Sequence, residues 1–341
     1  MISKKKVGIG VIGVGAIGRV HALHLATQIP RANLVGIADS YVVAAKRVAS
    51  ELGIEKTYPD YVELLENPDV DAILIATPPY LKREMIIKAA QAGKHIFVEK
   101  PMALSLKEVD DIIRETDRAG IKVQVGYQRR FDSSFLRAYQ AIKDGEIGKI
   151  QLITSCTRDP PGNPGGWSID PKLSGGMMLD TCSHDFDAIR WLSQDEITRV
   201  YAHGVTLIYE QFKPNKIPDN VLITLDLKSG ALAHVDSCQW TIYGYDAHAE
   251  VLGTEGAAFV GIGDRTSTTI LSKTGYKGEY PMTFIERFDQ AYRDEVVDFI
   301  DCIREDRQPK VTPRDGRAAI EIGLAADISM EKDAPVSLPL N

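Results

Sequence analysis

Apolar residues in the first 125 positions alternate between two spacings. Five short apolar runs predict β-strands, at residues 7–12, 34–38, 72–75, 95–98 and 122–125. Segments with apolar residues every three or four positions predict helices between these strands, at residues 17–28, 44–52, 81–92 and 106–119. Strands that alternate with helices form right-handed crossovers on a parallel sheet. Residues 1–125 are therefore expected to form one doubly wound α/β domain.

Cap residues support these helix boundaries. Asp60 and Ser105 have short polar side chains that can accept hydrogen bonds from the first N–H groups of a helix. Glu108 follows Ser105 by three positions, as in a capping box. Gly93 and Gly120 stand where left-handed C-terminal caps belong. We expect helices to begin after the two polar caps and to end near the two glycines.

The hydrophobic pattern changes after residue 125. Strand-like segments dominate the region from 150 to 271, and the clearest are residues 221–227, 231–240 and 248–252. Few helices interrupt them, which favours an open, mainly antiparallel sheet over a second doubly wound one. The last two predicted helices are residues 289–304 and 313–329. Residues 126–341 are thus expected to form a second domain, and the family resemblance described below implies that it serves substrate binding and oligomerisation.

Residues 175–187 place an acid and an imidazole at helical spacing. If this stretch is one helix, Asp180, His184 and Asp187 share a face, because positions i, i+4 and i+7 lie above one another. The apolar stripe of the same helix consists of Leu179, Cys182, Phe186 and Ile189. By itself an Asp and a His at this spacing are more often a surface pair than a catalytic one.

Composition is that of an ordinary globular protein. The 341 residues are 44% hydrophobic and 26% charged, with a formal net charge of −7. This acidity argues against nucleic acid or an anionic membrane as the main partner. The four cysteines lack any CxxC or zinc-finger spacing and are expected to be reduced thiols of a cytoplasmic protein. No stretch approaches the roughly 20 apolar residues that span a bilayer.

A glycine-rich turn follows the first predicted strand. Gly13, Gly15 and Gly18 have the G-x-G-x-x-G spacing, and Ala16 and Ile17 open the next predicted helix. The first glycine permits a tight turn, the second admits a pyrophosphate, and the third allows close packing of the helix. The helix amino terminus then offers N–H groups to the phosphates. The alternative interpretation is a glycine-rich turn that binds nothing.

An acidic residue accompanies this turn at the expected distance. Asp39 ends the second predicted strand, about 20 residues further on, where a carboxylate can accept hydrogen bonds from both ribose hydroxyls. Ser40 rather than an arginine follows it, so nothing there is suited to a 2′-phosphate. The sequence therefore predicts NAD rather than NADP as the cofactor.

Two later turns are expected to open onto the same crevice. Thr77 and Pro78 follow one predicted strand, and Glu99 and Lys100 follow the next. Ligands bind beyond the carboxyl ends of parallel strands, so all four residues are cofactor candidates. Lys100 could also donate a hydrogen bond to a substrate oxygen. The alternatives are a loop ended by prolines and an ordinary surface lysine.

Three motifs together resemble a known family. They are the glycine-rich turn, Glu99-Lys100-Pro101, and Gly175-Gly176 followed by Asp180 and His184. The combination is similar to the family named after glucose-fructose oxidoreductase, inositol dehydrogenase and the rhizopine-catabolism protein MocA, and it extends over nearly the whole chain. The resemblance implies a Rossmann domain and a second domain on a large open sheet, through which dimers or tetramers usually assemble. Within the family, the chain is most similar to inositol 2-dehydrogenases.

The resemblance also implies roles for individual residues. The family's catalytic lysine, aspartate and histidine correspond to Lys100, Asp180 and His184. His184 is the implied general base, Asp180 orients it, and Lys100 binds the reacting oxygen. The substrate candidates are these three residues with Arg130, Asp159, Asp187, Tyr243 and Tyr245. Trp167, in a loop rich in proline and glycine, is a further candidate for the substrate pocket.

Some positions depart from the family pattern. Thr157-Arg158-Asp159-Pro160 stands where many inositol dehydrogenases have His-Arg-Asn-Pro, and the loop over residues 160–174 differs from theirs. Lys82 replaces the histidine that often follows Thr-Pro in the family. These departures leave the implied chemistry in place and leave the identity of the polyol or sugar open.

The sequence therefore predicts an NAD-dependent dehydrogenase that oxidises a secondary hydroxyl of a cyclic polyol to a ketone, as a myo-inositol 2-dehydrogenase does. One alternative is a family enzyme for scyllo-inositol, an inositol derivative or an aldose. A second is a non-catalytic regulator that senses NAD. Asp180 and His184 could also ligate zinc, but a clear third ligand is lacking and no metal is expected.

Overall fold

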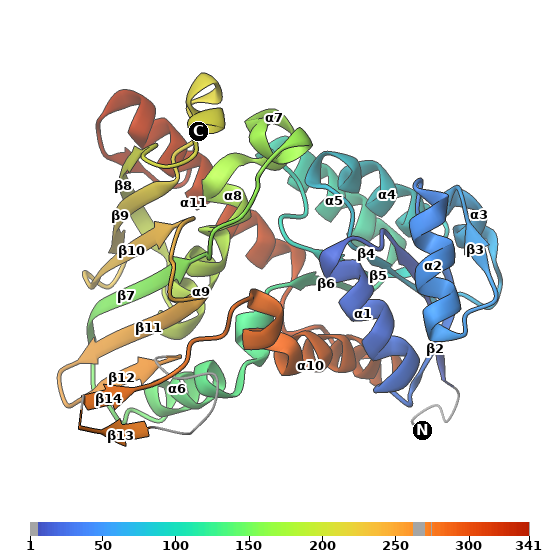
Figure 1. The fold of residues 1–341 in the computed structure, drawn as a ribbon, viewed down its shortest axis with the longest axis horizontal. Helices are drawn as coiled ribbons and strands as arrows, with labels where there is room; N and C mark the ends of the chain where they lie inside the picture. Colours follow the sequence, from blue (N-terminus) through green and yellow to red (C-terminus); the bar gives the residue numbers. More distant parts are fainter. Residues whose placement is uncertain (1–5, 262–269, 274, 341) are drawn as a thin grey trace. The chain divides into compact units, whose positions relative to one another are not determined.

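The computed structural model describes residues 6–261, 270–273 and 275–340. The chain divides into two compact units. The first comprises Met1–Gln128 and Gln290–Arg317, and the second comprises Arg129–Asp289 and Ala318–Asn341. Each unit has its own large β-sheet (Figure 1).

The first unit is built on six parallel strands in the order β3-β2-β1-β4-β5-β6. These strands are β1 (Val7–Ile12), β2 (Ala32–Ala38), β3 (Thr57–Tyr58), β4 (Ala72–Ile75), β5 (His95–Glu99) and β6 (Val123–Gly126). The helices that connect them are α1 (Ala16–Thr27), α2 (Val42–Leu52), α3 (Tyr61–Glu66), α4 (Pro79–Gln91) and α5 (Leu106–Ala119). The strand order reverses between β1 and β4, which is where such sheets bind ligands. The predicted doubly wound fold is confirmed, with predicted ends displaced by no more than two residues.

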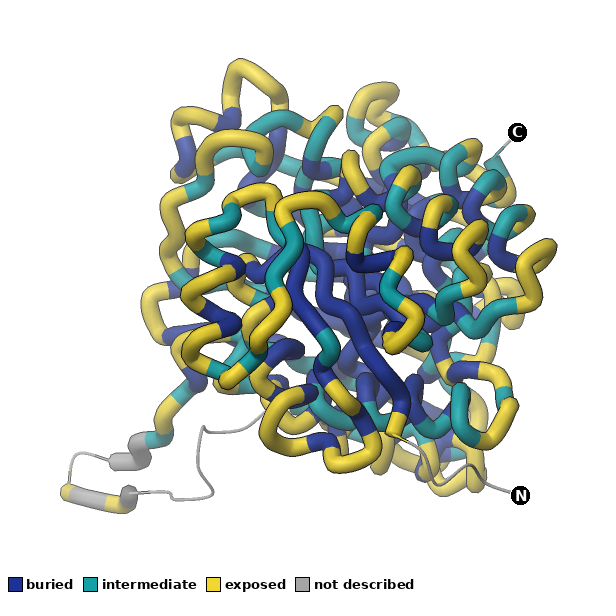
Figure 2. The backbone as a smooth tube through the Cα atoms, turned by 90° about the vertical axis from the view of Figure 1, so that its right-hand side faces the viewer, coloured by how far each residue is buried: buried dark blue, intermediate teal, exposed yellow. Residues whose placement is uncertain are grey.

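The strands of this unit are buried and its helices are exposed on their outer turns (Figure 2). Every residue of β1 and β4 is buried, as expected of parallel strands that helices cover on both faces. The later part of α10 (Phe284–Glu305) joins the same core through Val296, Phe299 and Ile300. A segment remote in sequence therefore completes the first unit.

The predicted helix caps are present. Asp60 and Ser105 accept hydrogen bonds from first-turn N–H groups of α3 and α5. The Glu108 carboxylate accepts a hydrogen bond from the Leu104 N–H, one residue before the N-cap, so only the Ser105 half of the expected capping box is formed. Gly93 and Gly120 have φ values of +70° and +66°, in the left-handed region that favours glycine. Local sequence thus fixes where these helices begin and end.

The second unit is built on a seven-stranded sheet in the order β12-β11-β7-β10-β9-β8-β15. These strands are β7 (Ile150–Arg158), β8 (Ile197–Val205), β9 (Asn220–Leu227), β10 (Leu232–Cys238), β11 (Asp246–Gly253), β12 (Ala257–Val260) and β15 (Val336–Ser337). Strands β13 (Ile270–Ser272) and β14 (Gly275–Lys277) form a separate pair. In the described part of the large sheet, β7 and β10 are parallel and the other pairs antiparallel. The predicted open, mainly antiparallel sheet is confirmed.

The two faces of this sheet have different surroundings. The helices of the second unit are α6 (Ser133–Lys143), α7 (Pro171–Ser174), α8 (Gly176–Asp180), α9 (Ser183–Ser193) and most of α11 (Pro313–Lys332). On β9, Val221 and Ile223 are buried while Leu222 between them is exposed. One face is therefore packed and the other, among the described residues, is open. None of the helices that the structure describes is long and apolar enough to cross a membrane.

Candidate active site

The glycine-rich turn lies at the carboxyl end of β1, where the strand order reverses. Gly13 has a φ of +88°. A Cβ at Gly18 would lie 2.0 Å from the carbonyl oxygen of Gly13, so only glycine lets α1 pack against the turn. A Cβ at Gly15 would meet no atom within 4 Å, so the space beside that backbone is open. The three glycines thus have the geometries that a pyrophosphate-binding turn requires.

The Asp39 carboxylate is held next to this turn. Its Oδ2 accepts a hydrogen bond from the Val14 N–H at 2.9 Å, and its Oδ1 accepts one from the Tyr41 N–H at 2.8 Å. A carboxylate oxygen can accept a further bond, so both remain able to bind ribose hydroxyls. Gly15 caps α1, and the first N–H groups of that helix, at Ala16 and Ile17, precede its hydrogen-bonded ladder. These residues fit a dinucleotide.

The other two predicted turns also follow strands of the first sheet. Thr77 and Pro78 follow β4, and a Cβ at Gly13 would lie 2.9 Å from Thr77 Cγ2. Glu99 ends β5 and is buried, whereas Lys100 after it is half-buried. All of these cofactor candidates belong to the first unit.

A buried ionisable cluster surrounds the Glu99 side chain. His21 Nε2 on α1 forms a hydrogen bond of 2.6 Å with Glu99 Oε1, and Glu295 Oε1 on α10 lies 4.0 Å from the same nitrogen. Glu295 is fully buried, and its carboxylate oxygens have no hydrogen-bond partner within the described ranges. Burial, aided by the charge of Glu99, raises the pKa of Glu295 well above its usual value. Sequence reasoning missed this cluster, because its members are far apart in the chain.

Asp180 and His184 lie on two short helices, so the expectation of one helix over residues 175–187 is wrong. α8 ends at Asp180 and α9 begins at Ser183. Between them the Cys182 N–H bonds to the carbonyl of Met177, five residues back, which inserts an extra residue into the turn. The predicted apolar stripe is buried, at Leu179, Cys182, Phe186 and Ile189.

A buried ion pair fixes α9 on β7. Arg129 Nη1 donates to Asp185 Oδ1 at 2.7 Å, and both groups are almost fully buried. The hydroxyls of Ser155 and Thr157 on β7 donate to the two oxygens of Asp185, at 2.6 and 2.7 Å. His184 directly precedes Asp185, so this network fixes the backbone that carries the imidazole. No pattern in the sequence indicated a role for Asp185.

The remaining substrate candidates have unequal surroundings. Arg130 and Asp187 form a buried bidentate pair, with Nε to Oδ2 at 2.9 Å and Nη2 to Oδ1 at 2.6 Å. Tyr245 is buried against Phe284 and Phe288, and burial raises the pKa of its hydroxyl. These candidates are therefore rigidly held within the second unit.

Three candidates lie nearer the surface. Trp167 is exposed in a short 3₁₀ helix (Gly166–Ile169), and the Asp159 N–H bonds to the carbonyl of Cys238. The Tyr243 hydroxyl accepts a hydrogen bond from Arg158 at 3.1 Å and donates one to Asp246 at 3.0 Å. Tyr243 thus belongs to a polar network on the second sheet.

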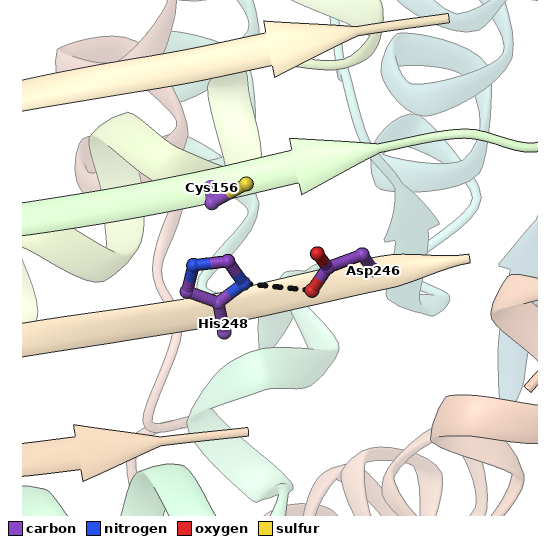
Figure 3. A group of neighbouring side chains, drawn as sticks. All are labelled: Cys156, Asp246 and His248. Carbon is purple, nitrogen blue, oxygen red and sulfur yellow. Dashed lines mark hydrogen bonds and ion pairs between the residues drawn. The ribbon is translucent and has the colours of Figure 1, made fainter. Parts of the chain in front are cut away.

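Cys156, Asp246 and His248 form another group of ionisable side chains, from β7 and β11 (Figure 3). His248 Nδ1 forms a hydrogen bond of 2.7 Å with Asp246 Oδ1. A tetrahedral zinc ion at about 2.1 Å from its nitrogen and oxygen ligands would hold those atoms roughly 3.4 Å apart. Burial raises the pKa of the Cys156 thiol, which keeps it protonated at neutral pH. The 2.7 Å between His248 Nδ1 and Asp246 Oδ1 is instead a hydrogen-bond distance, as is the 2.6 Å between His21 Nε2 and Glu99 Oε1.

Two family models match the chain. The NAD-binding Rossmann fold of an oxidoreductase family matches residues 7–127, and the GFO/IDH/MocA C-terminal domain matches residues 135–259. The chain belongs to the GFO/IDH/MocA family. The resemblance found in the three motifs is thereby confirmed.

The sequence similarity to other GFO/IDH/MocA proteins covers almost the full chain. Over 328 residues it is 40% identical to the scyllo-inositol 2-dehydrogenase (NAD(+)) of Bacillus subtilis (strain 168), covering 96% of this chain and 95% of that protein. Over 331 residues it is 36% identical to the myo-inositol 2-dehydrogenase of Thermotoga maritima, covering 97% and 98%. A crystal structure of scyllo-inositol dehydrogenase from Lactobacillus casei, with bound cofactor NAD(H) and scyllo-inositol, has a TM-score of 0.91 at 28% identity, covering 98% and 99%.

As a GFO/IDH/MocA protein, the chain is an NAD-dependent dehydrogenase, which confirms the predicted enzyme class and cofactor. The open space at Gly15 and the fixed carboxylate of Asp39 fit NAD. Lys100 belongs to the first unit, while Asp180 and His184 belong to the second. The separate roles of these three residues stay a prediction.

Proposed function

We propose that the protein oxidises a secondary hydroxyl of an inositol to a ketone, with the myo and scyllo isomers as the two candidate substrates. The identity of 40% and 36% to dehydrogenases of these two isomers, over nearly the full chain, carries this proposal. Lys100, Asp180 and His184 are all present in this chain, which favours an enzyme over a regulator. NAD, when bound at the glycine-rich turn, accepts the hydride.

We further propose that His184 is the general base that removes the hydroxyl proton. It lies on α9, whose Asp185 pairs with the buried Arg129 and accepts hydrogen bonds from Ser155 and Thr157 on β7. An ordinary imidazole has a pKa of about 6.5, which suits it to proton transfer near neutral pH. Asp180 is proposed to orient the imidazole and to stabilise its protonated form. Lys100 is proposed to bind the reacting oxygen and to stabilise the developing alkoxide.

The other hydroxyls of the ring need polar partners. The proposed partners for these hydroxyls are Arg130, Asp159, Trp167, Asp187, Tyr243 and Tyr245. The buried bidentate pair with Asp187 fixes the plane of the Arg130 guanidinium, which favours a fixed polar contact with the ring. A site that pairs each hydroxyl rejects rings that lack one, because a buried polar group is then left unpaired.

The test is an assay of NADH formation with inositol isomers and aldoses, with NADP in parallel, on the parent and two variants. His184→Ala is expected to lower kcat about 100-fold or more, because a general base typically contributes a factor of that size. Lys100→Met is expected to lower kcat far more than it lowers NAD affinity. Turnover of His184→Ala at the parent rate and pH profile would show that the base is another residue.

We also propose that the protein assembles through the outer face of its second sheet. Leu152, Leu232 and Leu252 face one another across β7, β10 and β11, with exposed fractions of 38%, 54% and 40%. A row of exposed leucines on an open sheet is typical of a surface that associates with another protein. The two-fold symmetric pairing of identical faces is the commonest way to cover it, in a dimer or a tetramer.

A cytoplasmic location is proposed from the cysteines. All four are free thiols, and Cys156, Cys182 and Cys302 are buried. Free cysteines without disulfides are typical of reducing compartments. Fractionation of the native cells, with detection by antibody, tests this proposal.

A further inference from the structure

A buried lysine lies directly beside the segment that carries Lys100. Lys82, near the start of α4, is 2% exposed. Its ammonium donates hydrogen bonds to three consecutive carbonyl oxygens, those of Glu99 at 2.6 Å, Lys100 at 3.0 Å and Pro101 at 3.0 Å. An ammonium has three N–H donors, so its donors match these three carbonyls. The sequence showed Lys82 only as a departure from the family's histidine.

The sheet topology explains how Lys82 reaches this place. β4 and β5 are parallel neighbours, with Ala72 opposite His95. α4 follows β4, so its first residues lie next to the carboxyl end of β5. The long aliphatic stem of a lysine then spans from the helix to the turn after β5. Glu99, Lys100 and Pro101 follow Lys82 by 17, 18 and 19 positions in the sequence, but all four residues lie at the same end of the sheet.

The same turn is also held through its side chains. Glu99 is hydrogen-bonded to His21 at 2.6 Å, and Glu99 and Pro101 are both buried. Lys100 stands between them and is half-buried. Lys82 therefore holds the backbone of the turn while His21 holds one of its side chains. Moving the three carbonyls away would deprive a buried ammonium of these three hydrogen bonds, which is costly.

We propose that Lys82 is the positioning residue for Lys100, because its bonds to three consecutive carbonyls fix the backbone from which the Lys100 ammonium extends. This inference rests on the proposed function, in which Lys100 binds the reacting oxygen. The effect on catalysis follows from geometry, because a misplacement of about 1 Å in an active site can lower a rate about 100-fold. Lys82 itself touches neither substrate nor cofactor in this proposal.

The test compares Lys82→Met with Lys88→Met. Lys88 lies on the same helix, is exposed, and pairs with Glu84 at 2.7 Å, so it is the matched control. Lys82→Met is expected to lower kcat about 100-fold while NAD affinity changes little. The isotope effect on kcat, with substrate deuterated at the reacting carbon, is expected to rise because the chemical step becomes slower. Lys88→Met is expected to leave both quantities at parent values.

A second readout does not depend on activity. Hydrogen exchange of residues 99–103 is expected to become faster in Lys82→Met and to stay unchanged in Lys88→Met. If the parent enzyme fails to oxidise any inositol, the proposed function is wrong, and the exchange rates still decide whether Lys82 fixes this turn. Unchanged exchange over residues 99–103 would overturn the proposal.

A conservative variant covers the case in which Lys82→Met does not fold. Lys82→Gln keeps two N–H donors and is expected to give a kcat between those of the parent and the methionine variant. A merely structural lysine would lower kcat only in proportion to the folded fraction, with an unchanged isotope effect. The proposed role is also contradicted if Lys82→Gln lowers kcat only in this way, with an unchanged isotope effect and with hydrogen exchange of residues 99–103 at the parent rate.

Discussion

At the scale of single residues, buried ionisable groups fix the position of the residues proposed for catalysis. Lys82 holds the backbone at Lys100, and Arg129 with Asp185 holds the helix that carries His184. Glu295 is different, because it is fully buried without a hydrogen-bond partner in the described part of the chain. Such a group costs stability when it is charged, so its effect should be visible as a dependence on pH.

The first prediction concerns Glu295 and pH. Its raised pKa means that the folded protein favours the protonated carboxyl. The stability that the protonated Glu295 contributes is complete below the pKa of an unfolded glutamate, about 4.3. It is lost as pH rises from there towards the folded pKa, and the free energy of unfolding then falls by up to about 1.4 kcal/mol per pH unit. Glu295→Gln stays neutral, so its free energy of unfolding should fall less than the parent's between about pH 5 and pH 8. Denaturant titrations at several pH values measure the difference.

An exposed glutamate provides the control for this prediction. Glu84 forms an ion pair with Lys88, and hydrogen bonding to Lys88 lowers the pKa of Glu84. Glu84→Gln should leave the slope of stability against pH above about pH 5 unchanged. Parallel curves for the parent and Glu295→Gln would mean that the buried carboxyl is not protonated in the folded protein.

At the scale of elements, local sequence and tertiary packing contribute differently. α5 begins after its predicted N-cap, Ser105, because the side chains of Ser105 and Glu108 accept hydrogen bonds from backbone N–H groups three or four residues away. The predicted helix over residues 175–187 instead divides into α8 and α9. Most residues of both helices are buried, and α9 is attached to β7 through Asp185. Long-range contacts therefore override the helical spacing at Cys182.

The second prediction concerns the cap of α5. The Ser105 hydroxyl accepts a hydrogen bond from the Glu108 N–H at 3.3 Å. Ser105→Ala leaves that N–H unpaired and should lower the free energy of unfolding by about 1 kcal/mol, the usual cost of losing an N-cap. Ser105→Asp restores an acceptor and should recover most of this loss. Equal denaturation midpoints for the parent and the alanine variant would show that the cap contributes nothing.

At the scale of the whole molecule, the open face of the second sheet is the surface proposed for association between copies of the chain. Val221, Ile223 and Leu225 fill the packed side of β9, whereas Leu222 points to the other side and is exposed. The strand alternation thus sorts apolar residues onto both faces of the sheet. Apolar residues on the uncovered face are an expected binding surface for a second copy.

The third prediction concerns that surface. Leu232 on β10 lies at one end of the leucine row, next to Leu152 on β7, which has Leu252 on its other side. Leu232→Glu places a charge there and should lower the molar mass in solution, measured by light scattering after size-exclusion chromatography, without unfolding the sheet. Val43→Glu, at an exposed position of α2, is the control and should leave the mass unchanged. An unchanged mass for Leu232→Glu would place the assembly surface elsewhere.

The sequence by itself determined the features that depend on neighbours along the chain. In the first unit these features are the strands other than β3, the helices α1, α2, α4 and α5, the caps at Asp60 and Ser105, and the geometry at Gly13. The mainly antiparallel second sheet also followed from the strand-like pattern.

The tertiary structure alone decided which distant groups meet. His21 and Glu99 are 78 positions apart, and Arg129 and Asp185 are 56 apart. Neither partner carries a local signal of the other, because these hydrogen bonds form only after strands and helices pack. The same holds for Lys82, whose three carbonyl partners become neighbours only when β4 and β5 pair. Local interactions choose the elements, whereas the burial of charged groups between those elements determines how the proposed catalytic residues are held.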